Sequence, residues 1–480
     1  MTTTKIADAA WVAAWDKEAE RHVYARDIDV VFRDDRIVHV GAGYDGAHDA
    51  LIDGRDLFVI PGLVNIHTHP ADEPAQKGVR EEMGVPEMYM SGLYERLQAF
   101  HLDADGHRAA AEVTYSELLA SGVTTVADLS AEYEGWIELI ARSGLRAYVA
   151  PFFASARWVM ESRHRLGYAW DEAAGSAGLD RALALIVEVE KHPCGRLSGM
   201  LYPGQIDTCT EALLRDATAA ARERGLPLTT HVAQSVVEFN EMTSRHGVTP
   251  IQWAEAVGLL GPGAILGHAI FIDQNSWLHW PGRRDLAILA DSGAAVAHCP
   301  TVFSRYGQTL QDLGGYLRAG VTVGIGTDCS PHNMIEEMRA AAILARVTAE
   351  DIDTLHTADV FHAATVGGAS ALGRDDIGRL APGAKADLVL IDLADVTMRP
   401  ARDPLRSLIY TAAERPVRAV YVDGRAVVEK GQVKTLDRAD AVARLEAAQA
   451  RMLAAAPEHD YAGRDAAQIS PPSLPSGRVG

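Results

Sequence analysis

Short apolar runs recur through the middle of the chain and alternate with longer stretches that have the 3.6-residue period of amphipathic helices. One such stretch, residues 106–122, predicts a helix that ends at Gly122. The apolar runs comprise residues 57–66, 123–129, 145–153, 197–202, 226–232, 264–272, 294–299 and 321–326. This alternation predicts right-handed βαβ units, and eight of them favour a closed, TIM-like (β/α)8 barrel over an open sheet.

The regions that flank this alternation have the pattern of short antiparallel strands. Residues 27–41 hold two alternating apolar runs on either side of Asp34-Asp35, which predicts a hairpin. Residues 386–393 and 418–433 form further short strand-like runs broken by turn residues. We therefore expect one small sheet domain to be built from both terminal regions.

Composition and charge narrow the class of partner. Hydrophobic residues make up 48% and charged residues 23% of the chain, which excludes disordered, collagen-like and coiled-coil proteins. The 65 acidic residues outnumber the 45 basic ones, for a net charge of −20, so we expect neither a nucleic acid nor an anionic membrane as a partner. No uncharged apolar run reaches the roughly 18 residues that a bilayer span requires.

The cysteines and the first residues bear on the compartment. Residues 1–21 lack a basic start followed by an apolar block, so we expect no signal peptide. No C-x-x-C pair occurs among the cysteines, which are Cys194, Cys209, Cys299 and Cys329. This spacing suits a reducing cytoplasm and argues against a disulfide framework or a cysteine-based zinc site.

Histidines and one aspartate end five of the apolar runs. In barrel enzymes the catalytic residues lie at the carboxyl ends of the strands, so these side chains are expected at one rim. They are His67 and His69 after the first run, His231 near the end of the fifth, His268 in the sixth, His298 near the end of the seventh and Asp328 after the eighth.

The chemistry of this set is metal binding. In the His67-Thr68-His69 segment two imidazoles lie on one side of the pleat, so both can reach one ion. A third imidazole and a carboxylate would complete a shell suited to zinc, iron, cobalt or manganese. Taken singly, His231 could be a core histidine, Asp328 a helix cap and His298 part of a packed turn. Their conjunction at one rim favours the metal site.

The segments that carry these residues resemble the signature segments of the amidohydrolase superfamily. They are PGLVNIHTH (61–69), TTHVA (229–233), LGHAIFID (266–273), AHCPTVFS (297–304) and GIGTD (324–328). The resemblance covers about residues 25–435. It implies a distorted (β/α)8 barrel with a β-sandwich domain, in which a metal-activated water attacks a carbon bonded to nitrogen, oxygen or halogen.

The predicted domains follow from the pattern and the resemblance together. Residues 1–60 and 374–435 are assigned to the composite β-sandwich, and residues 61–373 to the barrel. Residues 436–470 are expected to form a C-terminal helix. The Pro- and Ser-rich residues 471–480 are expected to form a disordered tail.

The resemblance also indicates the metal subtype. Dinuclear members often carry a bridging lysine at the end of the fourth strand, but that run here continues LYPGQ without a lysine. One divalent ion per subunit is therefore expected, Zn2+ first, with Fe2+, Co2+ or Mn2+ as alternatives. Its ligands would be His67, His69, His231 and Asp328. Asp328 and His268 would be the catalytic residues, because they would move protons and hold the attacking water or the substrate.

One departure from the family pattern concerns the substrate. Related deaminases and many chlorohydrolases have a glutamate three residues after the fifth-strand histidine, whereas this chain has Gln234. An amide forms hydrogen bonds but cannot relay a proton, which favours an amide, carbamate, thiocarbamate or urea over a heteroaromatic ring. A deaminase of a nucleobase-like ring, a hydrolytic dechlorinase and a non-catalytic binding protein are the alternatives. Gln234 could equally make a structural hydrogen bond.

Residues 66–82 and 326–339 are similar to those of phenylurea and molinate-type hydrolases, a smaller group within the superfamily. The expected partner is a small-molecule substrate, and the resemblance also suggests a homo-oligomer. The candidate substrate contacts are Gln234, His298, Tyr89, Trp277, Phe303 and Arg305. The aromatic residues among them could instead pack on the barrel.

Overall fold

Eight parallel strand positions form a closed barrel in the computed structural model, which describes the whole chain except residues 80, 82, 476 and 478–480. The barrel strands are β8 (Leu63–Thr68), β9 (Val123–Ser130), β10 (Arg146–Phe153), the short pair β13 (Leu197–Gly199) and β14 (Tyr202–Pro203), β15 (Leu228–Val232), β16 (Ala264–His268), β17 (Ala295–His298) and β18 (Thr322–Ile325). Parallel bridges between Leu201 and Leu228 and between Thr68 and Asp328 join the two halves of the barrel. The predicted (β/α)8 architecture is confirmed.

The first apolar run belongs to two sheets, so its prediction as a single barrel strand was wrong. β7 (Leu57–Pro61) pairs antiparallel with β19 (Leu388–Asp392), and the barrel strand β8 begins only at Leu63. The chain changes sheet at Gly62, where a Cβ atom would lie 2.1 Å from the Thr124 hydroxyl oxygen. Both strands are buried on both faces, so apolar periodicity could not show the break.

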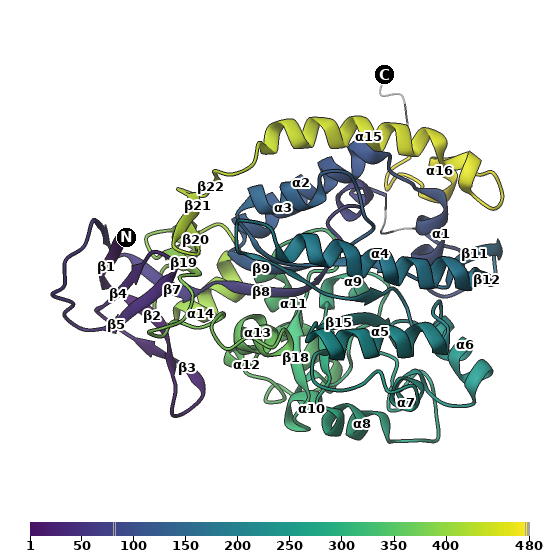
Figure 1. Cartoon of the computed structure of the whole chain (residues 1–480), viewed down its shortest axis with the longest axis horizontal. Helices are drawn as coiled ribbons and strands as arrows, with labels where there is room; N and C mark the ends of the chain where they lie inside the picture. Colours follow the sequence, from purple (N-terminus) through teal and green to yellow (C-terminus); the bar gives the residue numbers. More distant parts are fainter. Residues whose placement is uncertain (80, 82, 476, 478–480) are drawn as a thin grey trace.

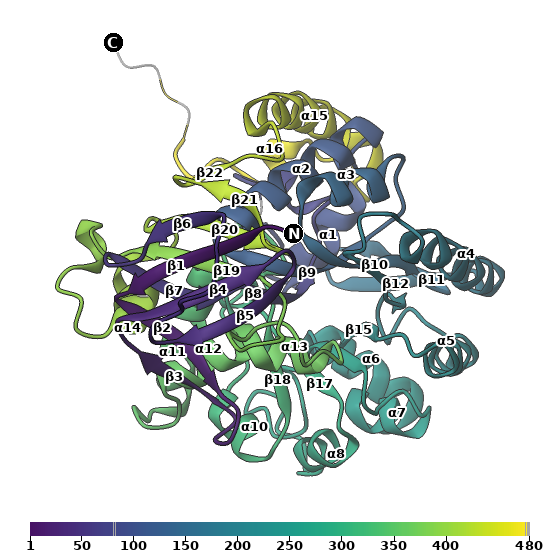
Figure 2. The same cartoon turned by 60° about the vertical axis from the view of Figure 1, so that its left-hand side comes forward.

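Two sheets built from both ends of the chain pack face to face as a β-sandwich (Figure 2). The larger sheet has the order β22-β21-β20-β19-β7-β2-β3 and the smaller one β5-β4-β1-β6. Apolar side chains such as Phe32 and Leu390 meet between them in one buried cluster. The remaining bounds are β1 (Thr3–Ala9), β2 (Trp11–Asp16), β3 (Arg21–Ala25), β4 (Ile28–Arg33), β5 (Arg36–Gly41), β6 (Ala50–Asp53), β20 (Val417–Val422), β21 (Arg425–Glu429) and β22 (Gln432–Val433).

The predicted hairpin at residues 27–41 is confirmed by the antiparallel pairing of β4 with β5. Arg33 lies opposite Arg36, and Asp34 takes a positive φ of 49° in the tight turn between them. Aspartate is one of the few residues other than glycine that tolerate this conformation.

Helices surround the barrel and cover its strands (Figure 1). They are α1 (Ser91–Ala99), α2 (Ala104–Ala120), α3 (Trp136–Ser143), α4 (Glu172–Glu190), α5 (Glu211–Arg224), α6 (Val236–His246), α7 (Pro250–Ala256), α8 (Asp285–Ser292), α9 (Pro300–Ser304), α10 (Leu313–Arg318), α11 (Met334–Ala349), α12 (Thr357–His362), α13 (Gly368–Ala371) and α14 (Pro404–Ser407). None of the helices in the described ranges is long and apolar enough to cross a membrane.

The C-terminal region packs on the outside of the barrel. Helix α15 (Arg438–His459) lies along α2, where Arg444 forms a 2.7 Å ion pair with Glu112 (Figure 1). The short helix α16 (Ala466–Ile469) follows. Part of the tail predicted at residues 471–480 lies outside the described residues.

A β-hairpin stands at the end of the barrel away from the sandwich, next to α1 (Figure 1). Its strands are β11 (Ala156–Ser162) and β12 (Arg165–Trp170), which continue from the carboxyl end of β10. The indole nitrogen of Trp158 and the hydroxyl of Tyr168 both donate to one oxygen of the buried Asp207, at 2.8 and 2.9 Å. These bonds fix the hairpin beside the barrel mouth.

Candidate functional site

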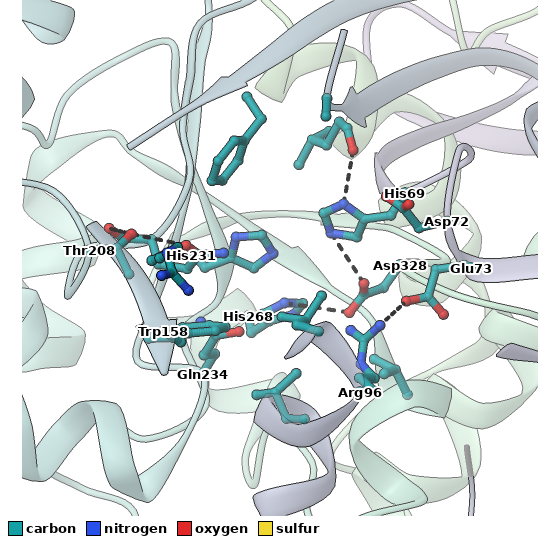
Figure 3. A pocket seen from close by; sticks show the side chains of 18 of the residues that line it. His69, Asp72, Glu73, Arg96, Trp158, Thr208, His231, Gln234, His268 and Asp328 are labelled. Carbon is teal, nitrogen blue, oxygen red and sulfur yellow. Dashed lines mark hydrogen bonds and ion pairs between the residues drawn. The ribbon is translucent and has the colours of Figure 1, made fainter. Parts of the chain in front are cut away.

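Three histidines and one aspartate meet at the carboxyl mouth of the barrel. Figure 3 shows His69, His231 and Asp328 of this group. One ring nitrogen from each of His67, His69 and His231 lies within 4.8 Å of the other two. Asp328 lies just after β18, and its Oδ1 atom is 3.4 Å from His69 Nε2 and 4.0 Å from His67 Nε2. The structure thus brings together residues that are up to 261 positions apart, from 67 to 328.

Backbone hydrogen bonds fix the aspartate against the first barrel strand. The Asp328 amide donates to the His67 carbonyl at 2.9 Å, and the His69 amide donates to the Asp328 carbonyl at 3.0 Å. Asp328 itself has a φ of 57°, in the left-handed region that non-glycine residues rarely adopt. Such backbone conformations are concentrated at functional sites, where the surroundings hold them.

Two of the imidazoles have a fixed proton position. Nδ1 of His69 is 2.9 Å from the Leu129 carbonyl oxygen, and Nδ1 of His231 is 2.8 Å from the Gly204 carbonyl oxygen. Because a carbonyl only accepts, each Nδ1 must carry the proton, which leaves the Nε2 lone pair directed to the centre of the group.

Two glycines make room for these rings. A Cβ atom at Gly326 would lie 2.7 Å from the His67 Cβ, and one at Gly267 would lie 3.0 Å from the His67 ring. The His67 side chain is fully buried, and neither of its ring nitrogens makes a hydrogen bond within the described residues. A larger residue at either position would displace this imidazole.

This donor set fits a divalent cation. Burial, followed by the neighbouring histidines, lowers the pKa of His67 well below 6.5, and burial and His69 lower the pKa of His231 to about 4. Neutral imidazoles with free lone pairs therefore stand beside a carboxylate. Two ligand atoms at about 2.1 Å from one tetrahedral ion lie about 3.4 Å apart, which matches the spacing of His69 and Asp328.

His268 lies on the opposite side of the Asp328 carboxylate. Its Nε2 is 3.6 Å from Asp328 Oδ2, and its ring packs edge-on against Phe303 at 4.3 Å. Burial, followed by His231 and His69, lowers the pKa of His268 well below 6.5. A neutral imidazole in this place can exchange a proton with the carboxylate or bind a water molecule between them.

A cavity of about 470 Å3 opens onto this group of residues. Leu93 of α1, Phe152 of β10, Trp158 of β11 and Phe303 of α9 give it apolar walls. A concave space of this size, with apolar walls and polar groups that converge on it, is typical of small-molecule sites.

The predicted substrate contacts differ in their placement. Gln234 and Phe303 line the cavity, and the Gln234 Nε2 atom is buried without a hydrogen bond to any described residue. His298 is buried, and burial lowers its pKa to about 4. The other three lie outside the described cavity lining: Tyr89 packs against Trp277 with ring centroids 5.1 Å apart, and Arg305 pairs with Glu81 at 3.1 Å. The assignment of all six to the substrate stays a prediction.

Several polar residues of the cavity were missed in the sequence, Arg96 and Tyr202 among them. Arg96 of α1 is nearly buried and forms a 2.7 Å ion pair with Glu73 (Figure 3). No apolar run ends at Arg96, so no pattern could single it out. Tyr202, in contrast, ends the fourth apolar run, and the rule that located the histidines applied to it equally.

A barrel of parallel strands with clustered imidazoles and a carboxylate at its carboxyl mouth defines a class of hydrolytic enzymes. The model of the amidohydrolase family matches residues 58–427, and the chain belongs to this family. The chain is accordingly a hydrolase that acts on carbon–nitrogen bonds other than peptide bonds.

Relatives and solved structures agree with this assignment. A Natronomonas pharaonis protein named 5-methylthioadenosine/S-adenosylhomocysteine deaminase is 30% identical over 83% of this chain and 88% of its own length. Atrazine chlorohydrolase from Arthrobacter aurescens, solved with zinc, is 25% identical with a TM-score of 0.75, over 93% of this chain and 100% of that one. A zinc-bound adenosine deaminase from Xanthomonas campestris has the same fold, at 24% identity and a TM-score of 0.77, over 94% and 98% of the two chains.

Proposed function

We propose that the protein hydrolyses an acyl carbon–nitrogen bond of a small molecule, as in an amide, carbamate, thiocarbamate or urea. His67, His69, His231 and Asp328 would hold one divalent ion, with zinc favoured by the zinc-bound solved structures of this fold. The ion, when bound, would lower the pKa of a water molecule and polarise the carbonyl group of the substrate.

The residues around this position can carry the proton through the reaction. An oxygen of Asp328 would accept the proton that the attacking water loses, and the same oxygen would pass it to the departing amine. His268 Nε2, 3.6 Å from the other carboxylate oxygen, would hold the water or the substrate in line. The apolar walls of the cavity would orient the remainder of the substrate.

Gln234 is the observation that carries the choice of an acyl substrate. It follows His231 by three residues, lines the cavity and is only 3% exposed. Hydrolysis at a heteroaromatic carbon requires protonation of a ring nitrogen, for which an amide offers no acid. An acyl substrate has no such requirement, because its amine can take the proton from Asp328 after the attack.

The second candidate is hydrolytic deamination of a purine nucleoside. It is favoured by the names of the relatives, which include 5-methylthioadenosine/S-adenosylhomocysteine deaminase and 5'-deoxyadenosine deaminase. The two candidates differ in their products, which are an amine and an acid in one case and ammonia and a hydroxylated ring in the other.

A hydrolysis panel with the metal content quantified tests the proposal. Aryl ureas, thiocarbamates, anilides, adenosine and 5-methylthioadenosine would be compared on one preparation loaded with zinc or cobalt. We expect amine release from at least one acyl substrate, at a kcat/KM above that for either nucleoside. Ammonia release from the nucleosides without any acyl hydrolysis would contradict the proposal and support the second candidate.

A further inference from the structure

Tyr202 occupies the mouth of the barrel at the strand position where no other site residue has been assigned. It forms β14 with Pro203 and pairs with Phe152 of β10 in parallel register. Its ring centroid is 5.8 Å from that of His231 and 6.2 Å from that of His69. Tyr202 is thus a direct neighbour of two of the clustered imidazoles, and it lines the same cavity.

The Tyr202 hydroxyl differs from those of the other buried tyrosines. Tyr94 bonds to the Ser235 hydroxyl at 2.6 Å, Tyr316 donates to the Ala269 carbonyl at 2.8 Å, and Tyr115 donates to the Asp128 carboxylate. The Tyr202 hydroxyl makes no hydrogen bond to any described residue, although only 3% of the residue is exposed. The hydroxyl is not among the enclosed side-chain atoms that lack a partner, so it is reached from the cavity, and a donor in this state is available to a ligand.

We propose that the Tyr202 hydroxyl donates a hydrogen bond to the oxygen of the substrate carbonyl and stabilises the negative charge that forms there. This inference rests on the proposed function. When the water oxygen bonds to the acyl carbon, the electron pair of the C–O double bond moves to the carbonyl oxygen. The C–N bond then breaks, the carbonyl re-forms, and the amine leaves with the proton that the water released.

The placement suits this role because the donor is fixed before the substrate binds. Tyr202 belongs to a strand, and its ring is held between Phe152, at 5.5 Å, and the His231 imidazole. A donor that is already oriented needs no reorganisation as charge develops, and one such donor contributes about 10²–10³-fold to kcat in known oxyanion holes.

Tyr202→Phe removes the hydroxyl and leaves the ring. On an acyl substrate that the wild-type enzyme cleaves, we expect kcat and kcat/KM to fall together by about 10²-fold, with KM and metal content unchanged. Tyr148→Phe is the matched control, since Tyr148 lies in the same barrel interior and its hydroxyl bonds to Arg374. It should leave kcat unchanged. A higher KM for Tyr202→Phe at constant kcat, or no effect on either, would overturn the proposal.

A binding experiment separates this inference from the proposed function. The zinc-loaded wild-type protein and Tyr202→Phe would be titrated by calorimetry with phenylphosphonate, a tetrahedral anion, and with benzamide, its planar neutral counterpart. We expect the variant to lose about tenfold or more in affinity for phenylphosphonate only, because hydrogen bonds to charged groups are the stronger ones. Equal phosphonate affinity of the two proteins would refute the role of Tyr202, whereas a wild-type enzyme that cleaves no acyl substrate would refute the proposed function instead.

Discussion

At His67, burial and local sterics combine to give an imidazole with no protein partner for its lone pair. The ring is fully buried, it makes no hydrogen bond to a described residue, and Gly267 and Gly326 leave only enough space for it. A buried polar group in this state is destabilising unless something binds it. Its neighbours supply the rest of a cation site, so an ion bound there would offset the cost of burying this imidazole.

The first prediction is that His67→Ala and Asp328→Ala each lose the metal and more than about 100-fold of the activity. Loss of a residue that merely supports a ligand already costs about 10–100-fold, so loss of a ligand should cost more. Metal content by mass spectrometry and turnover of the best acyl substrate check this. His246→Ala is the control, because His246 stacks on Trp253 at 3.7 Å outside the cavity. Stoichiometric metal in both ligand variants would contradict the assigned site.

Gln234→Glu tests whether the missing acid excludes ring chemistry. The buried Glu238 accepts hydrogen bonds from the backbone amides of Ala233 and Gln234, at 2.5 and 2.9 Å. Burial raises the pKa of Glu238 well above 4.5, and a second buried carboxyl beside it would be protonated near neutral pH for the same reason.

We expect Gln234→Glu to lower acyl hydrolysis and to raise ammonia release from adenosine by up to about 10²-fold, the typical contribution of a general acid. Gln234→Leu removes the amide without adding an acid. It should lower acyl hydrolysis and should not raise ammonia release from adenosine. Both rates can be measured on one preparation of each variant. If the wild-type enzyme released ammonia faster than Gln234→Glu does, the acid would not be the deciding group.

Between elements, a buried carboxyl joins α11 to the start of α9, the short helix that carries Phe303 of the cavity. Glu337 is fully buried, and its Oε2 atom accepts a hydrogen bond from the Thr301 amide at 3.1 Å. Burial raises the pKa of Glu337 from 4.5 to about 8, which the hydrogen bonds from Thr301 only partly offset. The folded protein therefore holds a proton here that the unfolded chain releases near pH 4.5.

The free energy of unfolding should accordingly fall by up to about 1.4 kcal/mol per pH unit between about pH 5 and 8 on account of this one group. The contribution is fully present below pH 4.5 and is lost as the pH rises through 8, because the folded pKa is the higher one. Glu337→Gln should flatten this slope in urea titrations at pH 6, 7, 8 and 9. Glu446→Gln, on the exposed side of α15, is the control and should leave the slope unchanged. An unchanged slope in Glu337→Gln would show that another group determines the pH dependence of the free energy of unfolding.

The strands and their terminal side chains were predictable from the sequence because parallel barrel strands are buried on both faces. Each gives a mostly apolar run, and a polar residue at or shortly after its end marks the rim, as His231 near the end of β15 and Asp328 after β18 do. Arg96 and Tyr89 lie in a long excursion between β8 and β9, where tertiary contacts set the conformation. The predicted domain boundary after residue 60 lies close to the change of sheet at Gly62, but apolar periodicity could not give its place, which depends on the space left by Thr124.

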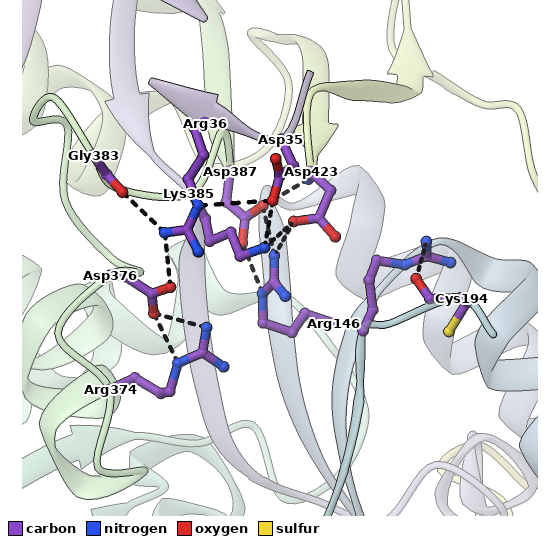
Figure 4. A network of polar contacts seen from close by, with 11 residues as sticks. Asp35, Arg36, Arg146, Cys194, Arg374, Asp376, Gly383, Lys385, Asp387 and Asp423 are labelled. Atoms are coloured by element: carbon purple, nitrogen blue, oxygen red, sulfur yellow. Dashed lines mark hydrogen bonds and ion pairs between the residues drawn. The ribbon is translucent and has the colours of Figure 1, made fainter. Parts of the chain in front are cut away.

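In the whole molecule, the β-sandwich is fixed to the barrel by a buried network of ion pairs (Figure 4). Arg146, at the start of β10, donates to both oxygens of Asp387 at 3.1 and 3.2 Å and to Asp423 at 2.5 Å. Lys385 adds an ion pair with Asp423 at 3.4 Å. Arg146 and Asp387 are each only 2% exposed, so each charge is stabilised by the opposite charge rather than by water.

Arg146→Ala should therefore lower the free energy of unfolding by about 3–5 kcal/mol, because it leaves the buried Asp387 carboxylate without its cation. The site at the far end of the barrel should keep its metal, since β10 contributes no predicted ligand. Arg55→Ala removes an exposed ion pair with Asp53 and should leave the free energy of unfolding nearly unchanged. Urea unfolding with metal analysis measures both effects.

A double variant, Arg146→Met with Asp387→Leu, should recover part of the lost free energy of unfolding if the unpaired charge causes that loss. A loss below about 1 kcal/mol in Arg146→Ala would mean that apolar contacts alone hold the two domains together.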